Sequence, residues 1–131
     1  MSKIVIWSSN FNNNTCRKNS NILFIFGDNV KRKGYAGQAI IRDEKNSFGI
    51  PTCKSPNVFF TDKELNYNKD IIDQSLKKLK KKIDTYDYIA FPINGIGTGL
   101  SMLKTRSPKT WEYLNSELYK HFNIVNKSYE Q

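Results

Sequence analysis

Several residue types are scarce in this sequence, and each shortage narrows what the protein can be. The only two cysteines, Cys16 and Cys53, have no metal-ligand spacing, so we expect free thiols in a reducing compartment, the cytoplasm. With a single histidine, His121, the chain has no His, Cys and Asp cluster, and we expect no metal. No apolar run approaches the roughly 20 residues that cross a bilayer, so we expect no membrane-spanning segment. The N-terminal apolar stretch is also too short for a signal peptide.

What is present indicates one folded domain, residues 1–131. A chain with 38% hydrophobic and 13% aromatic residues can bury a core and is not expected to be disordered. The formal net charge is +9, and a basic surface attracts phosphate-bearing partners. This charge is compatible with a nucleotide-like ligand and with nucleic acid, and it does not choose between them. The lysine-rich run Lys77–Lys82 is typical of the solvated face of a helix.

Apolar runs rich in β-branched and aromatic residues predict the strands. They are Lys3–Trp7, Ile22–Phe26, Ser47–Thr52 and Tyr86–Ile93, with a last short strand within the final segment Asn123–Gln131. The second of these runs is apolar throughout, as expected of a strand that is buried on both faces. The segment Ser9–Asn21 is rich in asparagine and serine and is predicted to be a loop.

Helical periodicity predicts the remaining elements. One apolar stripe predicts a helix over Lys69–Ile83. Its members are Ile72, Leu76, Leu79 and Ile83. Ser107 followed by Pro108 is typical of an N-cap and a first helical residue, and an apolar stripe from Trp111 to Phe122 continues that helix. A short helix is predicted over Ala36–Asp43. Strands that alternate with helices predict an α/β fold with a mixed central sheet.

Two glycine-rich segments follow predicted strands. GDNVKRKGYAGQ comes after Ile22–Phe26, and NGIGTGL comes after Tyr86–Ile93. In open α/β sheets, ligands bind beyond the carboxyl ends of the strands, where backbone N–H groups can hold phosphate. Neither segment matches the GxGxxG or the GxxxxGK[ST] nucleotide motif. We therefore predict that the two segments form the two halves of a phosphate clamp of another kind.

The blocks FGDN, GYAGQA, FGIPT and GIGTGL, which span Phe26 to Leu100, resemble the macrodomain family of ADP-ribose-binding proteins. They are similar to small uncharacterised macrodomain-like proteins, many of them phage-encoded, for which the compartment would be the host cytoplasm. The resemblance implies a three-layer α/β/α sandwich with a mixed central sheet and a ligand at the carboxyl edge of that sheet.

The resemblance also implies a set of ligand-binding residues. The set is Gly27, Gly34, Tyr35, Ala36, Gly37, Gln38, Asn94, Gly95, Ile96, Gly97, Thr98, Gly99 and Leu100. Backbone amides of both loops would hold the two phosphates. Tyr35 would either pack on a sugar or close its loop.

The resemblance implies catalytic candidates too, with departures from the family pattern. Asp28 would act as a base beside the distal ribose, Asn29 would orient that ribose, and Lys54 matches the lysine of a glycohydrolase subgroup. Ser101 stands where that subgroup has an acid, and IVIWSSN has no acid for adenine. The expected function is binding of ADP-ribose or a related nucleotide diphosphate, with or without hydrolysis of ADP-ribosyl groups, and without a cofactor. The alternative is a nucleic-acid-binding or protein-interaction module that keeps the fold.

Overall fold

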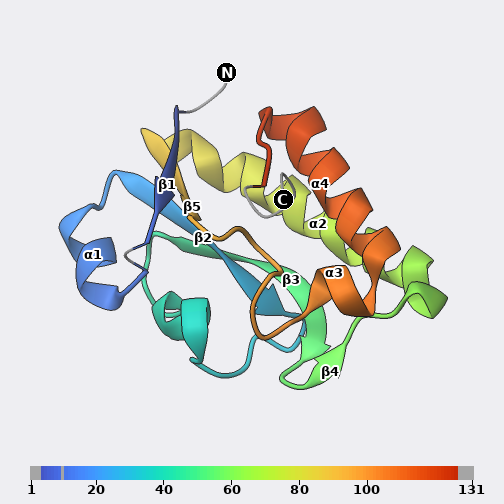
Figure 1. The fold of residues 1–131 in the computed structure, drawn as a ribbon. Helices are drawn as coiled ribbons and strands as arrows, with labels where there is room; N and C mark the ends of the chain where they lie inside the picture. Colours follow the sequence, from blue (N-terminus) through green and yellow to red (C-terminus); the bar gives the residue numbers. More distant parts are fainter. Residues whose placement is uncertain (1–3, 10, 127–131) are drawn as a thin grey trace.

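The computed structural model describes residues 4–9 and 11–126, which form a mixed α/β fold. Its five-stranded sheet has the order β1-β5-β2-β3-β4 (Figure 1). The strands are β1 (Ile4–Ser8), β5 (Tyr88–Pro92), β2 (Ile22–Asn29), β3 (Ser47–Ser55) and β4 (Val58–Phe59). β1, β5, β2 and β3 run parallel to one another, and β4 is antiparallel to β3. The sheet is therefore mixed, as the sequence predicts.

Strand β2 lies at the centre of the sheet because both of its faces are apolar. Leu23 and Ile25 belong to one buried cluster, and Phe24 and Phe26 belong to another. Alternate residues of a strand point to opposite faces, so the two clusters lie on the two sides of the sheet. Helices cover each side (Figure 1). They are α2 (Leu65–Lys82) and α4 (Pro108–Phe122) on one side, with α1 (Asn13–Lys18) and the 3₁₀ helix η1 (Gly37–Ile41) on the other.

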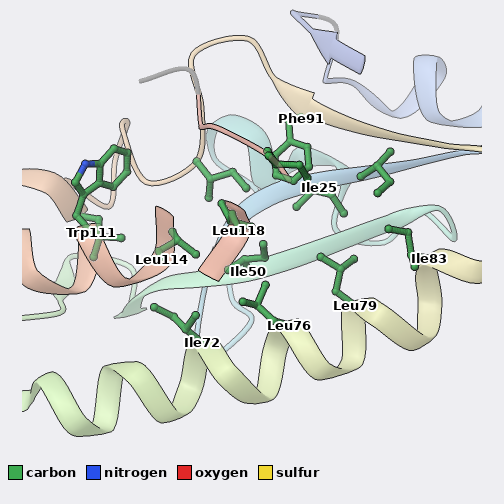
Figure 2. Packing of buried hydrophobic residues seen from close by; sticks show 14 of the residues in the cluster. Ile25, Ile50, Ile72, Leu76, Leu79, Ile83, Phe91, Trp111, Leu114 and Leu118 are labelled. Carbon is green, nitrogen blue, oxygen red and sulfur yellow. The ribbon is translucent and has the colours of Figure 1, made fainter. Parts of the chain in front are cut away.

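Helix α2 confirms three of the four members of the predicted apolar stripe, and the fourth, Ile83, is buried in the 3₁₀ turn that follows, η3 (Ile83–Thr85). Ile72, Leu76 and Leu79 are buried, and Figure 2 shows them on the side of α2 that faces the strand carrying Ile50. The helix begins at Leu65 rather than at Lys69, directly after a 3₁₀ turn, η2 (Asp62–Glu64). Most of its stability comes from this packing, because many of its outward residues are lysines with like charge.

Helix α4 begins at Pro108, as predicted, but its cap comes from elsewhere in the chain. The Ser107 side chain does not cap the helix; instead the Asp62 carboxylate accepts hydrogen bonds from the Lys109 N–H at 3.1 Å and the Ser107 hydroxyl at 2.9 Å. A carboxylate at this end also interacts favourably with the positive pole of the helix dipole. The contact joins the start of α4 to the turn that precedes α2.

Several short elements differ from the predictions. The segment Ser9–Asn21 is not only loop, because the Asn12 side chain accepts from the Thr15 N–H at 2.8 Å and starts α1. The predicted helix over Ala36–Asp43 is the shorter 3₁₀ helix η1. The four-residue helix α3 (Leu103–Arg106) was not predicted. No strand forms over residues 123–126, and the rest of the predicted last strand lies outside the described residues.

The parallel order brings the carboxyl ends of β5, β2 and β3 to one edge of the sheet, and both glycine segments start there (Figure 1). Among the described residues, no helix is both long and apolar enough to cross a membrane.

Candidate functional site

The two glycine segments meet in space. We call residues 27–38 the first loop and residues 94–101 the second loop. A Cβ placed on Gly27 would lie 3.4 Å from Ile96 Cγ2 and 3.6 Å from the Gly97 nitrogen. The Gln38 side chain bridges the loops, since its Oε1 accepts from the Gly27 N–H at 2.9 Å and its Nε2 donates to the Gly95 carbonyl at 3.3 Å. Gln38 therefore fixes the distance between the two loops with its side chain.

A cavity of about 430 Å³ lies between these loops and the end of β3. Its lining residues are Gly27, Asp28, Asn29, Lys33, Gly34, Ala36, Gly37, Gln38, Ala39, Thr52, Cys53, Pro56, Asn57, Gly97, Gly99, Leu100 and Ser101. A volume of a few hundred cubic ångströms is in the usual range for small-molecule sites, roughly 300–1,000 Å³. The cavity is therefore large enough for a small ligand to be enclosed.

Both loops present backbone N–H groups that the protein does not use. Within the described part of the chain, the N–H groups of residues 36–38 and 97–99 form no hydrogen bond. The backbone is left-handed at Gly37 (φ 58°) and at Gly97 (φ 83°), which favours glycine. At Gly97 a Cβ would also lie 3.2 Å from Leu103 and Trp111. Successive unpaired N–H groups in such turns are a typical anion-binding arrangement.

The Asp28 carboxylate is the anchor of the first loop. Its side chain is only 1% exposed, and it accepts from Arg42 Nη1 at 2.6 Å and from Arg32 Nη1 at 2.8 Å. Asp28 Oδ1 also accepts from the Asn29 N–H at 2.7 Å. The same arginines also bond to backbone carbonyls. Arg42 Nη2 donates to the carbonyls of Lys33 and Gly34, and Arg32 Nη1 donates to the Gly49 carbonyl. We call Asp28, Arg32 and Arg42 the arginine clamp.

The arginine clamp does not suit the predicted role of Asp28 as a general base. A base needs a free oxygen that can take a proton from a water beside the substrate. Both carboxylate oxygens of Asp28 already accept charged hydrogen bonds, and burial keeps water away from them. The arrangement favours a positioning role instead, in which the Asp28 carboxylate holds the shape of the first loop.

The other two catalytic candidates, Asn29 and Lys54, make contacts that the sequence did not predict. Asn29 lines the cavity, but its side chain bonds to its own loop, donating to the Lys33 carbonyl at 2.9 Å and accepting from the Lys33 N–H at 3.2 Å. Lys54 is not among the lining residues; its ammonium pairs with Glu64 Oε2 at 2.6 Å and lies over the Tyr67 ring. The geometry does not bring Lys54 together with Asp28 at the cavity.

Some of the predicted ligand-binding residues line the cavity, and the others hold the loops that form it. Eight of the set are lining residues, namely Gly27, Gly34, Ala36, Gly37, Gln38, Gly97, Gly99 and Leu100. Tyr35 is half-exposed and donates to Asp43 Oδ2 at 2.7 Å, which closes the first loop and raises the pKa of the phenol. Ile96 is buried, and its N–H and carbonyl bond to the Asn126 side chain.

Three more members of the predicted set lie outside the lining. They are Asn94, Gly95 and Thr98. The Gly95 N–H donates to the Pro92 carbonyl at 2.8 Å, and the Thr98 hydroxyl donates to the Asn94 carbonyl at 3.1 Å. These contacts turn the second loop back on itself, so the three residues shape the loop that carries Gly97 and Gly99.

Sequence reasoning missed one wall of the cavity. It comes from the end of β3 and the turn into β4, and it consists of Thr52, Cys53, Pro56 and Asn57. The Pro56 and Asn57 pair is a turn signal that could have located it. Burial raises the pKa of the Cys53 thiol, and the nearby Asp28 carboxylate adds to the effect. Cys53 is therefore a neutral thiol at pH 7.

Comparison with known proteins gives a family but no activity. Residues 6–117 match a family model described as "Family of unknown function (DUF7831)". Neither a search of curated proteins nor a search of solved structures returned a match.

We predict that Gly49→Ala destabilises the protein by at least about 2 kcal/mol, because the arginine clamp has no room for a methyl group. A Cβ at Gly49 would lie 2.4 Å from Asp28 Oδ2 and would push the carboxylate away from its arginines. The matched control is Gly99→Ala, since a Cβ there has no neighbour within 4 Å. Urea unfolding of both variants measures the difference. Equal midpoints for the two variants would contradict the importance of the clamp.

We predict that iodoacetamide modifies Cys53 faster than Cys16 in the folded protein, and both more slowly than in urea. The thiolate is the reactive form, and burial raises the pKa of Cys16 to about 11 and that of Cys53 above 9.0. Cys53 is 8% exposed on the cavity wall, whereas Cys16 is 0% exposed in the core. The Cys53 rate should therefore keep rising with pH above 9.0. Mass spectrometry of each cysteine-containing peptide gives the rates. A Cys53 rate in the native protein equal to that in urea at pH 7 would contradict the placement.

Proposed function

This chain belongs to the family of unknown function DUF7831, and we propose from its own cavity that it binds ADP-ribose or a related nucleotide diphosphate. One observation carries the proposal: two loops poor in side chains converge on one cavity, and both carry backbone N–H groups that form no hydrogen bond within the described residues. Such groups bind the oxygens of a diphosphate, whose negative charge they stabilise without a positively charged side chain.

The charge around the cavity supports an anionic ligand. Asp28 is the one carboxylate among the described lining residues, and two arginines more than neutralise it. Lys33 adds a further positive charge at the lining, and Lys31 is exposed in the same loop. A phosphate that enters the cavity therefore meets positive potential.

The position of the macrodomain-like sequence blocks in the fold supports the same ligand. The segments that resemble macrodomain blocks are the ones that border the cavity: FGDN and GYAGQA form the first loop, and GIGTGL forms the second. We propose that the sheet with helices on both sides is a macrodomain-like sandwich, with the ligand at the carboxyl edge of the sheet. The adenine would be held without the acidic residue that is common in that family.

We propose binding rather than hydrolysis of ADP-ribosyl groups. Hydrolysis would need a base at the distal ribose, and the Asp28 carboxylate would first have to leave both arginines. Breaking one partner of a buried ion pair costs roughly 3–5 kcal/mol, which opposes such a change. In this proposal Asp28 and Asn29 position the first loop, and the backbone of both loops makes the contacts with phosphate.

A specific surface favours nucleic acid as a second candidate. Lys77, Lys78, Lys80 and Lys81 are exposed on α2, which packs on the sheet with its opposite side. Binding of RNA or DNA to this surface would weaken steeply with salt and would not depend on the loops. The two candidates therefore make opposite predictions for variants of the second loop.

We predict that ADP-ribose binds the wild-type protein and that Gly99→Leu weakens this binding at least about tenfold. Gly99 is the best position for the test because it lines the cavity, its φ is not positive, and an added Cβ meets no protein atom within 4 Å. A leucine there should occupy ligand space without disturbing the fold. Isothermal titration calorimetry gives the affinity, and thermal unfolding should change by less than about 3 °C.

Two controls make the result specific. Lys78→Ala, on the exposed side of α2, should leave the affinity for ADP-ribose unchanged and should weaken any binding of RNA. Bound ADP-ribose should slow the alkylation of Cys53 and not that of Cys16, since only Cys53 lines the cavity. Absence of heat with ADP-ribose, together with salt-dependent RNA binding that Gly99→Leu preserves, would replace the proposal with the second candidate.

A further inference from the structure

The first loop runs along the cavity from one end to the other. At one end Gly37 faces the second loop, since a Cβ on Gly37 would lie 3.8 Å from Leu100 Cδ1. At the other end Gly34 faces the turn between β3 and β4, since a Cβ on Gly34 would lie 3.9 Å from Pro56 Cγ. Lys33 and Asn57 are lining residues and the chain neighbours of Gly34 and Pro56, so we assign them to the end of the cavity at the β3–β4 turn, away from the second loop.

Lys33 is held rigidly by its backbone while its ammonium group remains unused. Its N–H donates to Asn29 Oδ1, and its carbonyl accepts from Asn29 Nδ2 at 2.9 Å and from Arg42 Nη2 at 3.0 Å. Within the described residues, the Lys33 ammonium has no carboxylate, carbonyl or aromatic ring as a partner. The ammonium group is therefore available to an anion, and the fixed backbone limits the region that it can reach.

Asn57 contributes the second polar group of this end. Its backbone is left-handed with φ 65°, a conformation that asparagine tolerates better than most residues, and this places its side chain on the turn beside Pro56. Among the described residues, its side-chain amide has no hydrogen-bond partner. An ammonium and an amide at one end of a cavity can together bind the oxygens of a phosphate.

We propose that Lys33 and Asn57 form a second anion subsite and that the cavity selects ligands with a phosphate at both ends of a sugar. One phosphate binds the N–H groups of residues 97–99, and the other binds the Lys33 ammonium and the Asn57 amide. The inference rests on the proposed function, because the first phosphate occupies the site proposed for the diphosphate. It goes further by naming the class of ligand that binds best, a sugar bisphosphate or a nucleotide diphosphate whose distal sugar carries a phosphate.

The experiment measures affinities for pyrophosphate, ribose 5-phosphate, ribose 1,5-bisphosphate and ADP-ribose by calorimetry at one ionic strength. The wild-type protein should bind the bisphosphate at least about tenfold more tightly than the monophosphate. Lys33→Met should remove this preference, because it should weaken the binding of the bisphosphate by a larger factor than the binding of pyrophosphate or ADP-ribose. Asn57→Gly, which keeps the left-handed backbone, should reduce the preference in the same way.

Lys31→Met is the matched control, because Lys31 is exposed in the same segment and does not line the cavity. It removes the same charge and should leave the bisphosphate preference intact. Equal losses in Lys31→Met and Lys33→Met would overturn the subsite and leave only a general field of positive charge. A wild-type protein that binds ADP-ribose but shows no bisphosphate preference would refute the subsite alone. A wild-type protein that binds none of the probes would refute both the subsite and the proposed function.

Discussion

The buried carboxylate of Asp28 is the group on which the site depends. An ionised carboxylate costs several kcal/mol to bury unless charged partners and hydrogen bonds surround it. Arg32 and Arg42 meet that requirement, and each arginine also bonds to backbone carbonyls, so one ion-pair cluster fixes both the first loop and the start of β3. The absence of a side chain at Gly49 is part of the same solution, since the carboxylate lies where a Cβ would be.

The glycines then have a clear physical purpose. Each glycine costs conformational entropy on folding, but the lack of a side chain lets the backbone approach its neighbours closely. A Cβ on Gly97 would lie 3.2 Å from Leu103 and Trp111 on a left-handed backbone, so this position disfavours any side chain, whereas a Cβ on Gly27 would meet Ile96 and Gly97 at ordinary contact distances. The Gln38 side chain bonds to both loops and keeps them at a fixed separation. Two flexible segments thus become a defined wall, because the arginine clamp and Gln38 restrain them.

The predictions from sequence succeeded where the signal was local. The apolar run of β2 and the stripe of α2 depend on residues within one element, and both were located. The two loops could be predicted as a site from their glycines. The role of Asp28 could not, because Arg42 reaches it only after the first loop has folded. The position of Lys54 outside the lining could not be predicted for a similar reason: its partner, Glu64, comes from the turn before α2. The turn with Pro56 and Asn57 was missed because β4 has only two residues.

Charge balance at the cavity follows from the same cluster. A single aspartate beside a phosphate site would ordinarily repel the ligand, since two negative charges a few ångströms apart interact unfavourably. Here the aspartate brings two guanidinium groups with it, so the cluster carries a net positive charge although it contains the acid. One of these arginines also fixes the carbonyl of Lys33, a lining residue whose ammonium group pairs with no described residue. The residue that looked like a base in the sequence therefore acts, through its partners, to make the cavity attractive to anions.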